Sequence, residues 1–108
     1  MIEISVIRRD DGKVIGLSVE GHSGYAERGS DIVCAAVSAL AQSVLLSLAN
    51  HLHRELTYDV DSESGSLHVV LKDEPDELTE AVFSVALAGF AEVVKSCPQY
   101  VAIEDIRR

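Results

Sequence analysis

The chain has 108 residues, of which 47% are hydrophobic, and this length suits one domain with its own core. Its formal net charge of −9 argues against direct binding of nucleic acid, because a phosphate backbone requires a basic surface. We therefore predict a single domain over residues 1–108 whose acidic surface attracts basic partners.

The beginning of the chain and its cysteine content indicate a cytoplasmic protein. The first residues, MIEISVIRRDD, contain no apolar segment typical of a signal peptide. Cys34 and Cys97 are the only cysteines, and we expect both to be free thiols in a reducing compartment. Residues 32–52 lack Asp, Glu, Lys and Arg over a length that can span a bilayer, but other polar side chains interrupt this stretch. We expect a buried core helix there and no membrane partner.

The first half of the chain is expected to form a β-hairpin followed by a helix. Apolar and polar residues alternate over 2–6 and 15–19, the period of a half-buried strand. Between them, Asp-Asp-Gly at 10–12 is a hairpin signal, since glycine tolerates the positive φ of a tight turn. A loop at 21–30 then leads into a helix that runs to about Leu52.

The second half repeats this pattern. Residues 56–60 and 67–71 alternate in the same way, and Ser-Glu-Ser-Gly at 62–65 joins them. The acidic segment 73–76 opens a second helix, with its proline in the first turn, and that helix ends near Cys97.

A last strand at 100–106 completes the order ββαββαβ, which predicts an α+β fold with one mostly antiparallel sheet and two long apolar helices. The second helix is apolar on two stripes, one through Val85 and one through Phe90. Because one sheet covers only one side of a helix, we predict a homodimer in which a second copy covers the rest. The alternative is that the two helices bury each other within one subunit.

Cys34 is the candidate nucleophile. If Ser30 or Asp31 caps the first helix, Cys34 lies in the first turn, where free backbone N–H groups favour a thiolate and can also hold an oxyanion. His22 in the preceding loop can take the thiol proton and pass it to a leaving amine. A cysteine between valine and alanine in a helix is often a packing residue, however, and Asp31 disfavours a thiolate unless capping occupies it. Residue types alone leave both interpretations open.

Residues 21–40, GHSGYAERGSDIVCAAVSAL, resemble the signature of the ribosomal-processing cysteine protease (Prp) family. The resemblance implies an endopeptidase that removes a short N-terminal extension from a basic large-subunit ribosomal protein of bacteria. It implies Cys34 as the nucleophile and His22 as the general base, with no cofactor.

Further residues of the signature are expected to support the site. Asp31 either caps the helix or orients His22, and capping is favoured. Ser38, one turn after Cys34, hydrogen-bonds the thiol or the Cys34 carbonyl. The loop 21–30 is expected to close over the substrate. Its hinges are Gly21, Gly24 and Gly29.

Two other functions are weighed against the protease. One is a non-catalytic, ribosome-associated module that binds a basic ribosomal protein, with Cys34 as a core thiol; the other is a thiol-dependent acyl hydrolase of different specificity. His51 and His53 do not indicate a metal site, because residues two apart on a helix point to different faces.

Overall fold

The first β-hairpin follows the apolar alternation of its sequence. The computed structural model describes residues 1–22 and 31–108. Strands β1 (Ile2–Arg8) and β2 (Val14–Glu20) bury alternate residues, including Ile4 and Leu17. Gly12 in the connecting turn has φ +89°, a conformation that glycine adopts without strain.

The remaining elements appear in the predicted order. They are α1 (Ile32–Leu46), β3 (Leu56–Asp61), β4 (Ser66–Leu71), α2 (Glu77–Ser96) and β5 (Val101–Arg107). A short π-helical segment, η1 (Ser47–His51), continues α1, so the predicted helix up to about residue 52 is nearly right. The ββαββαβ order and the α+β class are confirmed.

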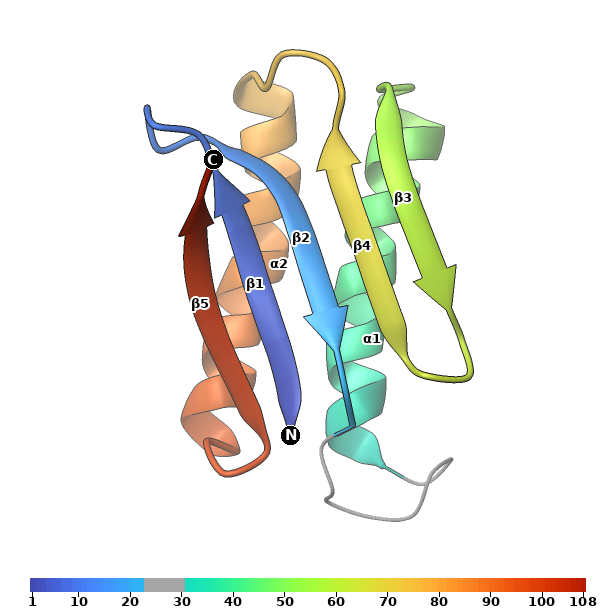
Figure 1. Cartoon of the computed structure of the whole chain (residues 1–108), viewed down its shortest axis with the longest axis vertical. Helices are drawn as coiled ribbons and strands as arrows, with labels where there is room; N and C mark the ends of the chain where they lie inside the picture. Colours follow the sequence, from blue (N-terminus) through green and yellow to red (C-terminus); the bar gives the residue numbers. More distant parts are fainter. Residues whose placement is uncertain (23–30) are drawn as a thin grey trace.

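The strands form one sheet in the order β3-β4-β2-β1-β5. All neighbouring strands are antiparallel except β1 and β5, which are parallel. Both helices lie on the same face of the sheet, and the opposite face stays open (Figure 1). The hydrophobic core therefore lies between the sheet and the helices, as expected for a two-layer domain.

Each helix begins at an aspartate cap and buries one stripe. The α1 stripe consists of Val33, Val37, Ala41 and Val44, at the spacing that places side chains on one helix face. In α2, Asp76 and Thr79 form a capping box, and Phe83 and Phe90 are buried. Pro75 precedes the cap, so the prediction that it occupies the first helical turn is wrong.

We expect residues 32–52 to form a buried core helix, and this is true only for the stripe of α1 that faces the sheet. Within the described part of the chain, Ile32–His51 is long and apolar enough to cross a membrane by length and composition. Its inner stripe packs in the core, whereas Leu46 is 54% exposed. The apolar outer surface of this helix is thus left uncovered in the single chain.

The two helices also contact each other. A Cβ added to Gly89 of α2 would lie 2.7 Å from Leu40 Cδ1 of α1, so the absence of a side chain allows this close approach. The alternative, in which the two helices bury each other within one subunit, is therefore true in part. Val85 of α2 nevertheless remains 71% exposed.

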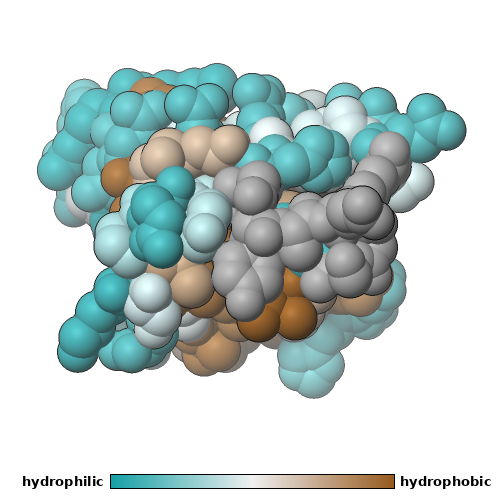
Figure 2. Space-filling model, turned by 90° about the horizontal axis from the view of Figure 1, so that it is seen from below, coloured by the Kyte–Doolittle hydropathy of each residue, from teal (hydrophilic) through white to brown (hydrophobic). Residues whose placement is uncertain are grey.

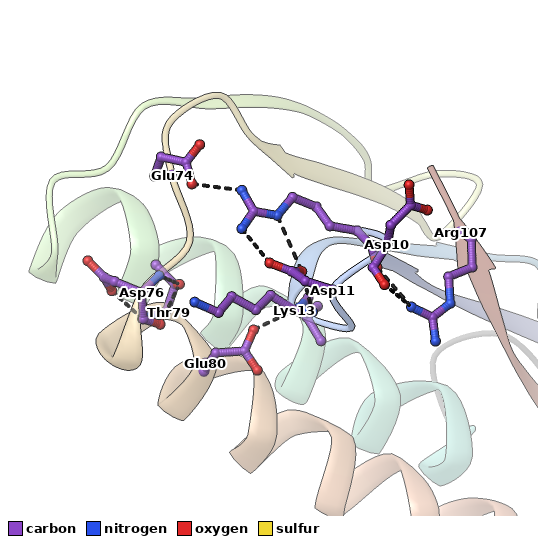
Figure 3. Close-up of polar contacts among 10 residues, drawn as sticks. Asp10, Asp11, Lys13, Glu74, Asp76, Thr79, Glu80 and Arg107 are labelled. Atoms are coloured by element: carbon purple, nitrogen blue, oxygen red, sulfur yellow. Dashed lines mark hydrogen bonds and ion pairs between the residues drawn. The ribbon is translucent and has the colours of Figure 1, made fainter.

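Ion pairs join the β1–β2 turn to the start of α2 at the end of the molecule where that helix begins (Figure 3). Arg9 contacts Asp11 and Glu74, each at 2.7 Å. The hydrogen bond from Arg9 lowers the pKa of Asp11 from 3.8 to about 2. Glu80 of α2 accepts a hydrogen bond from the Val14 backbone N–H at 2.7 Å. These contacts connect the β1–β2 turn with the first turn of α2 and the residues just before it.

Candidate active site

The backbone around Cys34 is set by Asp31, the N-cap of α1. Asp31 Oδ1 accepts hydrogen bonds from the backbone N–H groups of Val33 and Cys34, both at 3.0 Å. The predicted capping role of Asp31 is confirmed. Ser30, the other candidate cap, lies outside the described residues.

The same carboxylate also contacts the thiol. Cys34 Sγ donates a hydrogen bond to Asp31 Oδ2 at 3.2 Å, and the cysteine is half-buried at the edge of the core. Asp31 therefore holds the start of the helix with one oxygen and the thiol with the other. In this arrangement the hydrogen bond from the thiol to Asp31 must break, and the thiol must lose its proton, before the sulfur can attack a carbonyl carbon.

The expectation that free N–H groups of the first turn hold an oxyanion does not fit two of them in this arrangement. The N–H groups of Val33 and Cys34 are bonded to the Asp31 side chain. The capping that positions Cys34 uses the donors that an oxyanion would need. The backbone N–H of Cys34 is thus a poor candidate for an oxyanion donor in this arrangement.

His22 follows β2 through Gly21, whose φ is +91°. A Cβ on Gly21 would lie 2.4 Å from the Met1 carbonyl oxygen, which gives this glycine a packing requirement. The His22 ring is exposed and lies against Gly65 in the β3–β4 turn. Among residues 1–22 and 31–108, no hydrogen bond joins the imidazole to the Cys34 thiol.

Cys34 and His22, the candidate nucleophile and base, nevertheless belong to the same end of the molecule. β2 ends and α1 begins at the lower end in Figure 1, beside the β3–β4 turn. Seen from below, this end presents both hydrophobic and hydrophilic surface (Figure 2).

The remaining predicted residues fall into two groups. Ser38 is exposed, and its Oγ accepts a hydrogen bond from Gln42 Nε2 at 2.8 Å; neither of its expected bonds to Cys34 is recorded. Gly24 and Gly29 lie outside the described residues, so the closing of loop 21–30 stays a prediction.

Cys34 and Cys97 are not joined by a disulfide, and Cys97 is the C-cap residue of α2. Across the described ranges, no group of three or more His, Cys, Asp and Glu residues is placed to hold a metal ion. The sequence interpretation did not include Gly65 in the site. Its only signal was a hairpin turn, which gives no reason to connect it with His22.

The comparisons with known proteins identify the class of protein as a cysteine protease. The ribosomal processing cysteine protease Prp of Staphylococcus aureus is 24% identical over 93 residues, covering 86% of this chain and 88% of the relative. Its counterpart in Mycoplasma pneumoniae is 29% identical over 92 residues, covering 85% and 88%. Residues 1–102 match the family described as cysteine protease Prp, so the chain belongs to that family.

Solved structures share the fold. Prp from Staphylococcus aureus, in complex with a covalently linked product peptide, matches with a TM-score of 0.90 at 21% identity, covering 98% of this chain and 100% of that one. A protein of Streptococcus mutans matches with a TM-score of 0.81 at 27% identity, covering 100% and 96%. The resemblance in residues 21–40 is confirmed, and the enzyme interpretation is favoured over a non-catalytic module.

Proposed function

We propose that this cysteine protease removes a short N-terminal extension from a basic large-subunit ribosomal protein, with Cys34 as the nucleophile and His22 as the general base. One observation carries the proposal. The Cys34 thiol is fixed at a capped helix start, at the end of the sheet from which the His22 strand emerges.

The reaction follows from these two groups. Cys34 Sγ attacks the carbonyl carbon of the scissile peptide bond while His22 takes the thiol proton. The C–N bond then breaks, His22 gives the proton to the leaving amine, and the N-terminal fragment stays on Cys34 as a thioester. Water, deprotonated by His22, hydrolyses the thioester and restores the thiol.

Asp31 has a defined role in these reaction steps. It holds the thiol in the resting protein through Oδ2, and it keeps the helix start in place through Oδ1. When the proton passes to His22, only the first of these contacts has to break. The backbone position of the nucleophile is therefore maintained during the reaction.

A peptide substrate is supported by the relatives. The Staphylococcus aureus protease has been solved with a substrate peptide and with a covalently linked product peptide. Charge supports a basic one here, since the net charge is −9 and Glu3, Glu20 and Glu104 are exposed on the sheet face that the helices leave open. We place the reaction in the cytoplasm, the expected location of the enzyme.

We also propose that the enzyme is a homodimer. The support is the uncovered apolar surface of the helices, where Leu46 is 54% and Val85 is 71% exposed. Between the helices a groove of about 310 Å³ is lined by Leu40, Ser43, Val44, Ser47, Ala81, Val82, Val85 and Ala86. A second copy that covers this groove would bury Val85, which lines it.

Mass spectrometry of a peptide that spans the extension tests the proposed reaction. The parent and a Cys97→Ala control should cut the peptide at one bond, whereas Cys34→Ala and His22→Ala should leave it intact. Binding of the peptide without cleavage by the parent would refute the proposal. Cleavage by Cys34→Ala would refute the assignment of the nucleophile.

A further inference from the structure

The position of His22 depends on how β2 pairs with β4. These strands are antiparallel, with Ser18 opposite His68 and Val19 opposite Leu67. Continued by two residues, this register brings Gly21 level with Gly65 in the β3–β4 turn. The turn therefore lies beside the point where the chain leaves the sheet to carry the base.

Side chains on the open face of the sheet fasten this register. His68 Nδ1 is 2.7 Å from Ser18 Oγ, and His68 Nε2 is 3.2 Å from Glu20 Oε1. One histidine on β4 thus contacts two residues of β2, the second of which directly precedes Gly21. These contacts hold β2 against β4 up to the residue before the turn that leads to His22.

The β3–β4 turn is itself well braced. Gly65 N–H donates to the Asp61 carbonyl at 2.9 Å, and Asp61 Oδ1 accepts from Glu63 N–H at 3.0 Å. An aspartate that accepts from the residues following it is a common way to stabilise a tight turn. The turn consequently presents Gly65 as a fixed surface toward His22.

Gly65 contacts His22 closely. A Cβ at Gly65 would lie 3.4 Å from Cε1 and 3.8 Å from Nδ1 of the His22 ring, and 3.6 Å from the Gly21 carbonyl oxygen. A single methyl group fits at these distances, but a longer side chain would occupy the space of the ring. The φ of +76° is a second and independent reason for glycine at this position.

We propose that Gly65 is a positioning residue for His22, because its missing side chain lets the imidazole lie on the β3–β4 turn, at the end of the molecule where α1 begins with Cys34 in its first turn. The inference rests on the proposed role of His22 as the general base. A misplacement of about 1 Å between reacting groups can cost roughly 100-fold in rate, so displacement of the ring has a large effect on kcat.

The test separates the space at Gly65 from its backbone strain. Gly65→Ala and Gly65→Asn are compared with Gly12→Ala and Gly12→Asn, because Gly12 also has a positive φ, of +89°, and a Cβ there meets nothing within 4 Å. Asparagine tolerates positive φ better than alanine. Strain alone therefore makes the alanine variant the less stable one at both positions.

For catalysis we expect the opposite order at Gly65, with the asparagine variant worse than the alanine variant, because the longer side chain displaces the His22 ring. We expect kcat to fall by less than about tenfold in Gly65→Ala and by about 100-fold in Gly65→Asn, with KM within about twofold of the parent. Both Gly12 variants should keep the kcat of the parent within about twofold. A kcat that follows stability, with Gly65→Ala worse than Gly65→Asn, or a Gly65→Asn variant with the parent's kcat, would overturn the inference.

A spectroscopic readout tests the position of the ring without catalysis. The Cε1–H signal of His22 in a ¹H–¹³C correlation spectrum, assigned by its loss in His22→Gln, should shift in Gly65→Asn and stay in place in Gly12→Asn. An unmoved signal in Gly65→Asn refutes the positioning role by itself. Absence of peptide cleavage by the parent would instead refute the proposed function, and the catalytic consequence at Gly65 with it.

Discussion

Replacement of Asp31 separates its two roles in the resting enzyme. Asp31→Ala removes the acceptor of two backbone N–H groups at a position that is only 9% exposed. Loss of an N-cap of this kind costs about 1 kcal/mol of unfolding free energy, within a range of about 0.5–2 kcal/mol. Asparagine caps helices as well as aspartate, so Asp31→Asn should stay within about 0.5 kcal/mol of the parent.

The second role concerns the thiol, which donates to Asp31 Oδ2 at 3.2 Å. Both variants remove this charged acceptor. Hydrogen bonds to charged groups contribute about 1.5–3 kcal/mol, and a thiol is a weak donor, so we take the lower limit. About 1.4 kcal/mol corresponds to a factor of about ten, and we expect alkylation of Cys34 to accelerate by up to that factor in both variants.

The assay is the rate of iodoacetamide labelling, followed by mass spectrometry of the peptides that contain Cys34 and Cys97. Cys97 is an internal reference because it is the C-cap residue of α2 and does not belong to the helix that Asp31 caps. Urea unfolding of the same three proteins gives the stability difference. Labelling of Cys34 in Asp31→Asn at the parent's rate would refute the thiol contact, and a loss of stability as large as in Asp31→Ala would refute the capping argument.

Three further predictions concern the scaffold. Arg9 lowers the pKa of Asp11 to about 2, so the ion pair stabilises the fold above pH 3.8 and this effect is lost as the pH falls through about 2. Between these pH values the melting temperature of Arg9→Gln should therefore fall less than that of the parent. The difference should be small because the pair is exposed. Gly89→Ala places a methyl group 2.7 Å from Leu40 Cδ1, and this contact offsets the helix preference of alanine. In urea unfolding, Gly89→Ala should therefore be about 1 kcal/mol more favourable in a Leu40→Ala background than in the parent; the same effect in both backgrounds would contradict this. Val85→Glu should convert the proposed dimer to a monomer in sedimentation velocity, and an unchanged sedimentation coefficient would refute the proposed interface.

The elements of the fold could be predicted because their signals are local. Alternating residues, the Asp-Asp-Gly turn and the cap at Asp31 each lie within a few residues of the structure that they specify. The parallel pairing of β1 with β5 has no such signal, because it depends on how the helices pack on the sheet.

The sequence supplies the candidate residues of the site but not their geometry. The signature led to Cys34 and His22, and the cap at Asp31 follows from its place before the helix. The hydrogen bond from the Cys34 thiol to the same carboxylate depends on the side-chain rotamer of Asp31, which the sequence does not specify. The contact between His22 and Gly65 depends on the register of two strands that are distant in the sequence, which local patterns do not specify.

The most direct test of the account is capture of the covalent intermediate. The substrate peptide is mixed with the enzyme and quenched in acid within the first turnover, and the intact protein and its fragments are then weighed. We predict an adduct with the mass of the N-terminal fragment, attached as a thioester to Cys34 and absent from Cys34→Ala. An adduct on Cys97, or cleavage of the peptide without any adduct on Cys34, would contradict the central claim that Cys34 is the nucleophile.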